Sequence, residues 1–66
     1  MNVLFNGKNI EIKENKSLLD LLNDLDINTQ YTAVSVNNVL VQKIRHPEFI
    51  PNKNDVIEIL TPMQGG

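Results

Sequence analysis

Hydrophobic and polar positions divide the chain into short segments with different spacings. Residues 1–5 begin as a strand, and residues 10–13 alternate apolar and charged side chains, which is typical of a half-buried strand. Between them lies Asn6-Gly7, a dipeptide that favours a tight turn because both central positions of that turn need a positive φ. The opening of the chain is therefore predicted to be a β-hairpin.

A helical spacing follows in residues 17–25. Leucines recur at positions i, i+3, i+4 and i+7, which places them on one side of a helix: Leu18, Leu21, Leu22 and Leu25. Ser17 is a suitable N-cap, and Asp20 places negative charge in the first turn, where the helix dipole favours it. The pattern predicts one amphipathic helix of roughly ten residues, which is too short to be stable alone and must pack on a sheet. Asp26 is a candidate to end this helix.

The second half of the chain is predicted to be mostly strand. Three segments are rich in β-branched or alternating apolar residues: 32–36, 39–41 and 56–60. Asn37-Asn38 is suited to a turn, whereas Pro47 and Pro51 prevent a long regular element in residues 42–55. The order is ββαβββ, which predicts an α+β fold with a mixed sheet of about five strands packed on one helix.

Composition narrows the possible chemistry. The 66 residues make one domain, and a chain of that size hides only about 60% of its unfolded surface, which leaves little room for a catalytic cavity. The absence of cysteine excludes disulfides, thiolate nucleophiles and cysteine-ligated metals. A net charge of −2 and a pI near 5.1 argue against nucleic acid as a partner. No segment resembles a signal peptide or a membrane span, so we expect no membrane partner and a cytoplasmic location.

The last predicted strand has two different faces. Ile57 and Ile59 share one face, while Val56, Glu58 and Leu60 share the other. Because a glutamate in the core is costly unless it is paired, we expect the isoleucines to point inward. Val56, Glu58 and Leu60 are then a candidate partner-docking surface. The alternative is that these are scattered surface residues, which are normal on any protein.

The chain ends in Gly65-Gly66 shortly after this strand. We expect a single domain over residues 1–61 and a flexible tail over residues 62–66. Two residues without Cβ can enter a slot too narrow for any other residue, so the terminal carboxylate of Gly66 is the first candidate functional group. Met63 and Gln64 are expected to contact the partner's active site together with Gly65. The alternative is an unstructured or artificial end.

Other polar residues are weaker candidates for chemistry. His46 is the sole histidine, and the sequence places no metal-binding or catalytic partner beside it. Lys43 and Arg45 are better explained as ordinary surface charge than as a docking site for an acidic patch. A solvated helix face explains the three nearby carboxylates: Asp20, Asp24 and Asp26. We therefore predict no catalytic residue and no metal site.

The strand order, the length and the ending in residues 55–66 together resemble the ThiS family, the sulfur carriers of thiamine biosynthesis. The resemblance includes the Leu-Phe-Asn-Gly opening at 4–7, the leucine-rich helix and Val36-Asn37. The terminal diglycine is shared by all β-grasp carriers and modifiers, whereas Pro62-Met63-Gln64 is more particular to this family. The resemblance implies a ubiquitin-like β-grasp fold over the whole chain.

Two turns depart from the family pattern. Asn38 stands where family members commonly have glycine, and residues 52–55 replace a common Asp-Gly-Asp turn. Asparagine adopts left-handed backbone more readily than other non-glycine residues, so both turns are expected to keep their geometry. Neither change touches the terminus.

The resemblance implies that Gly66 carries the chemistry. A ThiF-like adenylating enzyme would use ATP and Mg to convert the carboxylate into an acyl-adenylate. A sulfur donor such as a cysteine desulfurase would then supply the sulfur of a Gly66 thiocarboxylate, and a ThiG-like thiazole synthase would consume it. The protein itself would be a co-substrate that binds no cofactor, is not an enzyme, and is monomeric when free.

Three alternatives remain open from the sequence. One is the small subunit of a molybdopterin synthase (MoaD-like), which is also a sulfur carrier. Another is a ubiquitin-like modifier whose Gly66 forms isopeptide bonds with lysines. The last is an interaction module whose terminus is inert.

Overall fold

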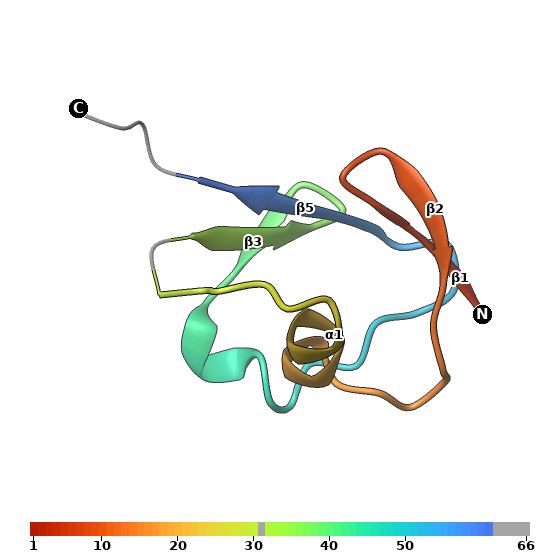
Figure 1. Ribbon diagram of the computed structural model, residues 1–66, viewed down its shortest axis with the longest axis horizontal. Coiled ribbons are helices and arrows are strands. Elements are labelled where there is room, and N and C mark those ends of the chain that lie inside the picture. Colours follow the sequence, from red (N-terminus) through yellow and green to blue (C-terminus); the bar gives the residue numbers. More distant parts are fainter. Residues whose placement is uncertain (31, 62–66) are drawn as a thin grey trace.

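The computed structural model of the protein describes residues 1–30 and 32–61 (Figure 1). Its first two strands, β1 (Asn2–Phe5) and β2 (Lys8–Glu11), pair antiparallel and confirm the predicted hairpin. Asn6 and Gly7 have φ angles of 48° and 83°, as the tight turn requires. The return strand begins at Lys8 and not at residue 10, because a two-residue turn pairs Phe5 directly with Lys8.

The helix α1 (Leu18–Asp24) has seven residues and is shorter than predicted. Ser17 is its N-cap, and the Ser17 hydroxyl oxygen accepts from the Asp20 amide at 3.1 Å. Two further amides of the first turn donate to the irregular segment after β4: Leu18 to the Phe49 carbonyl at 2.7 Å and Leu19 to the His46 carbonyl at 3.0 Å. The irregular segment therefore satisfies donors that a helix terminus leaves free.

A left-handed residue ends the helix, as suggested for Asp26, whose φ is 59°. The Asp26 amide donates to the Asn23 carbonyl at 3.0 Å, and the Ile27 amide donates to the Leu22 carbonyl at 2.9 Å. This pair of bonds is the Schellman motif. Leu25 is consequently the C-cap, and 39% of it is exposed, so this last leucine of the predicted stripe lies outside the buried core.

The remaining strands are β3 (Ala33–Val36), β4 (Val39–Val41) and β5 (Val56–Leu60), with the 3-10 helix η1 (Lys43–Arg45) after β4. The described residues form one five-stranded sheet in the order β2-β1-β5-β3-β4. In this sheet β5 pairs parallel with β1 and antiparallel with β3. The sheet is mixed and α1 lies against one side of it, as predicted (Figure 1).

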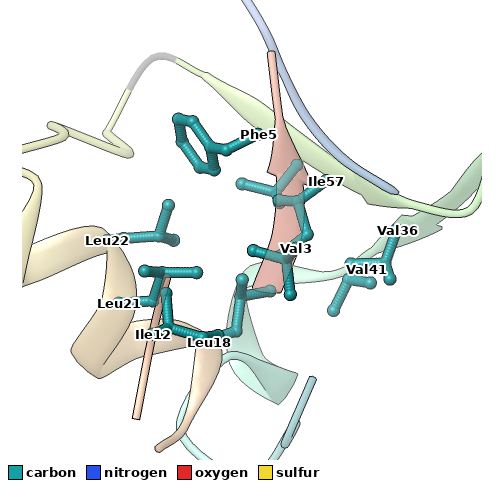
Figure 2. Packing of buried hydrophobic residues seen from close by; sticks show 10 residues of the cluster. Val3, Phe5, Ile12, Leu18, Leu21, Leu22, Val36, Val41 and Ile57 are labelled. Atoms are coloured by element: carbon teal, nitrogen blue, oxygen red, sulfur yellow. The ribbon is translucent and has the colours of Figure 1, made fainter. Parts of the chain in front are cut away.

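The core lies between α1 and the sheet (Figure 2). It joins the leucines of α1 to the inward side chains of the strands and to Ile12, which follows β2: Val3, Phe5, Ile12, Leu18, Leu21, Leu22, Val34, Val36, Val41 and Ile57. Ile57 is fully buried and Ile59 packs against this cluster, which confirms that the isoleucines of β5 point inward. The central strand of the sheet is therefore held by the core along one face.

Candidate functional site

The candidate site is the end of β5 and the sheet face around it. Met63, Gln64, Gly65 and Gly66 lie outside the described residues, so their predicted roles stay predictions. The described chain reaches Thr61, one residue beyond Leu60. What the structure adds is how this end of the central strand is positioned and which side chains surround it.

The face of β5 opposite the core carries the predicted docking residues. Glu58 is exposed, Val56 is half-buried, and 52% of Leu60 is exposed. All three alternate with the inward isoleucines, so they share one side of the strand. The structure therefore brings these three residues together.

Neighbouring strands enlarge this face. Leu4 of β1 lies opposite Val56, and Ala33 of β3 lies opposite Leu60. Leu40 of β4 is added because Ser35 of β3 pairs with Glu58 on one side and with Leu40 on the other. Side chains of paired residues share a face of the sheet. We call this set the outer face: Leu4, Ala33, Ser35, Leu40, Val56, Glu58 and Leu60.

The outer face is mainly apolar, with 39% of Leu4 and 61% of Leu40 exposed. Sequence analysis missed both leucines as parts of the site. The signal was available for Leu4, because Val3 and Phe5 alternate around it and point inward. For Leu40 the strand has three residues, too few for the alternation to decide which side faces the core.

Asn37 fixes the start of β5. Its side-chain oxygen accepts from the Val56 amide at 2.8 Å, and its side-chain nitrogen donates to the Asp55 carboxylate at 3.0 Å. The other oxygen of that carboxylate accepts from the Asn52 amide at 2.7 Å. The Asn37 backbone amide also donates to the Val56 carbonyl at 2.7 Å. The turn after β3 is thereby bonded to the turn before β5.

Asn6 fixes the end of the same strand. The Asn6 backbone amide donates to the Ile57 carbonyl at 2.9 Å, and its side-chain oxygen accepts from the Ile59 amide at 2.8 Å. The hairpin turn ends β1 at Phe5, so the Asn6 side chain replaces the backbone acceptor that a longer β1 would provide. Asn6-Gly7 was predicted to be only a turn. The role of its side chain depends on residue 59 and has no local signal in the sequence.

The turns that depart from the family pattern keep left-handed backbone. Asn37 and Asn38 have φ angles of 53° and 67°, and Asn54 has a φ of 69°. Each of these angles favours glycine or asparagine over other residues. The substitutions therefore preserve the turn geometry, as expected.

Charged groups lie mostly away from the outer face. Lys16 donates to Asp24 at 2.5 Å, and this hydrogen bond raises the pKa of Lys16. The Nε atom of Arg45 lies 3.7 Å from Oε1 of Glu48, so the positive charge of Arg45 is partly neutralised by a residue of the same segment. Glu58 places a carboxylate within the apolar outer face.

His46 is buried, and its Nε2 is 3.1 Å from the Val41 carbonyl. Because that carbonyl only accepts, Nε2 carries the proton and donates. Among residues 1–30 and 32–61, no group of three or more histidine, cysteine or acidic side chains is arranged to hold a metal ion. None of the helices in those same residues has the length and hydropathy to cross a membrane.

The whole chain is similar in sequence to known proteins. A model of the ThiS family matches residues 3–66. The chain is 34% identical to the uncharacterized protein ycf40 of Porphyra purpurea, over all of the chain and 93% of that protein. It is 30% identical to the uncharacterized protein ycf40 of Pyropia yezoensis, with the same coverage.

The solved structures agree. The crystal structure of a thiamine biosynthesis protein (ThiS) from Geobacter metallireducens covers the whole chain and is itself wholly covered, with a TM-score of 0.87 and 26% identity. The solution structure of a thiamine biosynthesis protein from the same organism has a TM-score of 0.74 and 25% identity, covering 100% of this chain and 88% of that one. These likenesses confirm the predicted β-grasp fold, and the chain belongs to the ThiS family.

Proposed function

We propose that this protein is a sulfur carrier for thiazole formation in thiamine biosynthesis, and that its terminal Gly66 carboxylate is the group that carries sulfur. The observation that carries the proposal is that the ThiS family match runs through residues 3–66 and so includes Gly66. The likeness to a thiamine biosynthesis protein supports the same role. The absence of cysteine is consistent with sulfur being carried at the terminal carboxylate, because the chain has no thiol that could carry it as a persulfide.

The chemistry requires activation of the carboxylate. A free carboxylate is a poor electrophile because its leaving group would be oxide. In a ThiF-like partner a carboxylate oxygen of Gly66 attacks the α-phosphate of ATP, pyrophosphate leaves, and an acyl-adenylate forms; Mg belongs to this partner's reaction. The terminal sulfur of a persulfide, made by a donor such as a cysteine desulfurase, then displaces AMP. A thiol cleaves the resulting disulfide by two-electron reduction and leaves the Gly66 thiocarboxylate for a ThiG-like thiazole synthase.

The folded domain has a surface that could dock on the partner enzymes. The outer face offers three exposed leucines, Leu4, Leu40 and Leu60, and Leu60 is the last residue of β5. An exposed apolar surface is suited to docking on a protein partner, and a charged residue within it, Glu58, would need a polar group on that partner. The partner enzymes supply the catalysis, and this chain binds no cofactor, acts as their co-substrate and works in the cytoplasm.

Intact-mass measurement tests the proposal. Incubation with the adenylating partner, ATP and a sulfur source should replace one C-terminal oxygen by sulfur. A chain lacking Gly66 is the matched control and should stay unchanged. Ladders of larger adducts would instead indicate a protein modifier. An unchanged mass, with the partner active on another carrier, would leave an inert interaction module.

Pathway assignment needs a second measurement. The thiocarboxylated protein should support thiazole formation by a thiazole synthase and should not support dithiolene formation by the large subunit of a molybdopterin synthase. The opposite result would identify a MoaD-like subunit.

Gly65 tests whether the tail enters a narrow slot. The Gly65→Ala variant adds a Cβ where partner walls are expected to be close. We expect adenylation to fall steeply while the circular dichroism spectrum stays unchanged. Full activity of this variant would reject the narrow slot and leave the sulfur-carrier role intact.

A further inference from the structure

Asn6 has a chemical feature that no other asparagine of the chain shares: the next residue is glycine. It also holds the last part of the central strand, because its side-chain oxygen accepts from the Ile59 amide at 2.8 Å. A chemical change at this side chain would therefore act directly on the end of β5.

We propose that Asn6 is a site of spontaneous deamidation, and that the isoaspartate product releases the end of β5. The Gly7 amide nitrogen gives up its proton to base and attacks Asn6 Cγ. The new N–Cγ bond forms as the Cγ–Nδ2 bond breaks, and ammonia leaves. Water then opens the cyclic imide at either carbonyl and produces aspartate or isoaspartate at position 6. The net reaction consumes one water and releases one ammonia, with no oxidant or reductant.

Two structural features favour attack at this turn. Apart from Gly7 itself and its two chain neighbours, no heavy atom lies within 4 Å of the place where a Cβ of Gly7 would stand, so the nucleophilic residue has open space around it. The Ile59 amide already donates to Asn6 Oδ1, the oxygen on which negative charge develops when Cγ is attacked. A preorganised donor at a developing oxyanion lowers the barrier of such a step.

The second hairpin turn of the molecule is a natural control. Asn37 also precedes a residue with a positive φ, and its Oδ1 also accepts from a backbone amide, that of Val56. The next residue is Asn38, however, and any side chain hinders attack by its own amide nitrogen more than the hydrogen of glycine does. The leaving group differs as well, because Asn37 Nδ2 donates to the Asp55 carboxylate at 3.0 Å. Loss of ammonia from Asn37 would break that bond. We therefore expect Asn37 to react more slowly than Asn6.

The two products have different consequences. Aspartate at position 6 keeps an oxygen where Asn6 Oδ1 accepts from Ile59, so it preserves the contact. Isoaspartate routes the backbone through the former side chain, lengthens the turn by one atom and moves the carboxylate away. The Ile59 amide then loses its acceptor, and the end of β5 is released on the edge facing β1, while its pairing with β3 remains. The effect on sulfur transfer rests on the proposed function, whereas the effect on Ile59 does not.

The test ages the full chain in warm, mildly alkaline buffer and locates each deamidated residue by fragmentation mass spectrometry. The rate of deamidation at Asn6 should be at least about tenfold higher than the rate at Asn37. The Gly7→Asn variant reproduces the dipeptide of the second turn and should slow Asn6 toward the rate of Asn37, with the remaining difference due to the hydrogen bond from Asn37 Nδ2 to Asp55. Equal rates at the two sites in the unmodified chain would overturn the proposal.

Hydrogen exchange measures the consequence on the separated products. Exchange at Ile59 should be faster in the isoaspartate fraction and unchanged in the Asn6→Asp variant. An isoaspartate fraction with normal exchange at Ile59 would reject the release of the strand end. Sulfur transfer by fresh and aged protein distinguishes the two proposals. Fresh protein that accepts no sulfur would refute the carrier role, while fresh and isoaspartate forms that transfer equally would refute only the functional effect of deamidation.

Discussion

The two ends of β5 are held very differently. At its start, the carbonyl of Asp55 accepts from the Leu4 amide at 2.9 Å, and Asn37 contributes both atoms of its side-chain amide to Asp55 and Val56. At its end, β5 pairs with β3 as far as Leu60 along one edge, and along the other edge the Ile59 amide donates to a single side chain, that of Asn6. Burial follows the same gradient, because 9% of Asp55 but 52% of Leu60 is exposed.

The two ends of β5 differ mainly in the hydrogen bonds along the edge that faces β1. The start is bonded on both sides and shares its network with two turns, so it should open only with the rest of the fold. On the edge facing β1, the end depends on one side chain and should open at lower free energy.

Removing the Asn37 side chain should have the largest effect. The Asn37→Ala variant loses two hydrogen bonds of about 1 kcal/mol each, and alanine in left-handed backbone costs about 1 kcal/mol more. We expect the free energy of unfolding to fall by about 3 kcal/mol, measured by urea denaturation. Asn37→Gly is the control: it loses the same bonds without the backbone cost and should be the less destabilised of the two. Equal losses in the two variants would show that the left-handed backbone contributes nothing.

Removing the Asn6 side chain should have a smaller effect. The Asn6→Ala variant loses one hydrogen bond to Ile59 and carries the same left-handed backbone cost, for a total of about 2 kcal/mol. Hydrogen exchange at Ile59 should rise more than exchange at Val56. Asn6→Asp keeps the accepting oxygen and should exchange like the unmodified protein. A uniform rise along β5 would mean that the strand opens as one unit and that its two ends do not differ.

Leu60 tests the exposed end without disturbing the fold. Because 52% of Leu60 is exposed, Leu60→Ala should change the free energy of unfolding by less than about 0.5 kcal/mol. If the outer face docks on the adenylating partner, the same variant should weaken binding roughly tenfold, measured by titration calorimetry. Ile44→Ala is the matched control, since Ile44 is an exposed aliphatic residue on η1 and not on the outer face. Equal weakening by both variants would argue against the outer face as the docking surface.

Local patterns predicted the fold well. The turn at Asn6-Gly7, the leucine stripe of α1 and the inward isoleucines of β5 each depend on residues close together in the sequence, and the structure confirms them. The errors lie at element ends. The helix stops at Asp24 because Asp26 adopts a left-handed conformation. The leucine pattern gave no sign of this end, because it continues to Leu25.

The candidate site could be predicted only in part. Val56, Glu58 and Leu60 were found by alternation within one strand, but Leu40 joins them through pairing of β4 with β3, which no local pattern specifies. The contacts of Asn6 with Ile59 and of Asn37 with Val56 span 53 and 19 residues of sequence. Such side-chain contacts follow from strand order, so they become visible only once the fold is known.

The ion pair between Lys16 and Asp24 lies away from β5. Removing it should change the free energy of unfolding less than the other variants do, so it serves as a baseline for them. The hydrogen bond to Asp24 raises the pKa of Lys16 above its ordinary value of 10.5. A raised lysine pKa stabilises the folded state below the unfolded pKa, and this contribution is lost as pH rises through the folded pKa. The advantage of the unmodified protein over Lys16→Gln should therefore stay constant from neutral pH to about 10.5 and disappear above it.

Urea denaturation across this pH range measures that baseline. Because both side chains are solvent-accessible, the difference should be smaller than that of any Asn6 or Asn37 variant and should shrink in high salt. The pair joins the segment before α1 to the end of α1, so hydrogen exchange at Val56 and Ile59 should be unchanged in Lys16→Gln. If that variant altered exchange at Ile59 as much as Asn6→Ala does, the opening of the strand end would reflect overall stability and not its own weaker attachment.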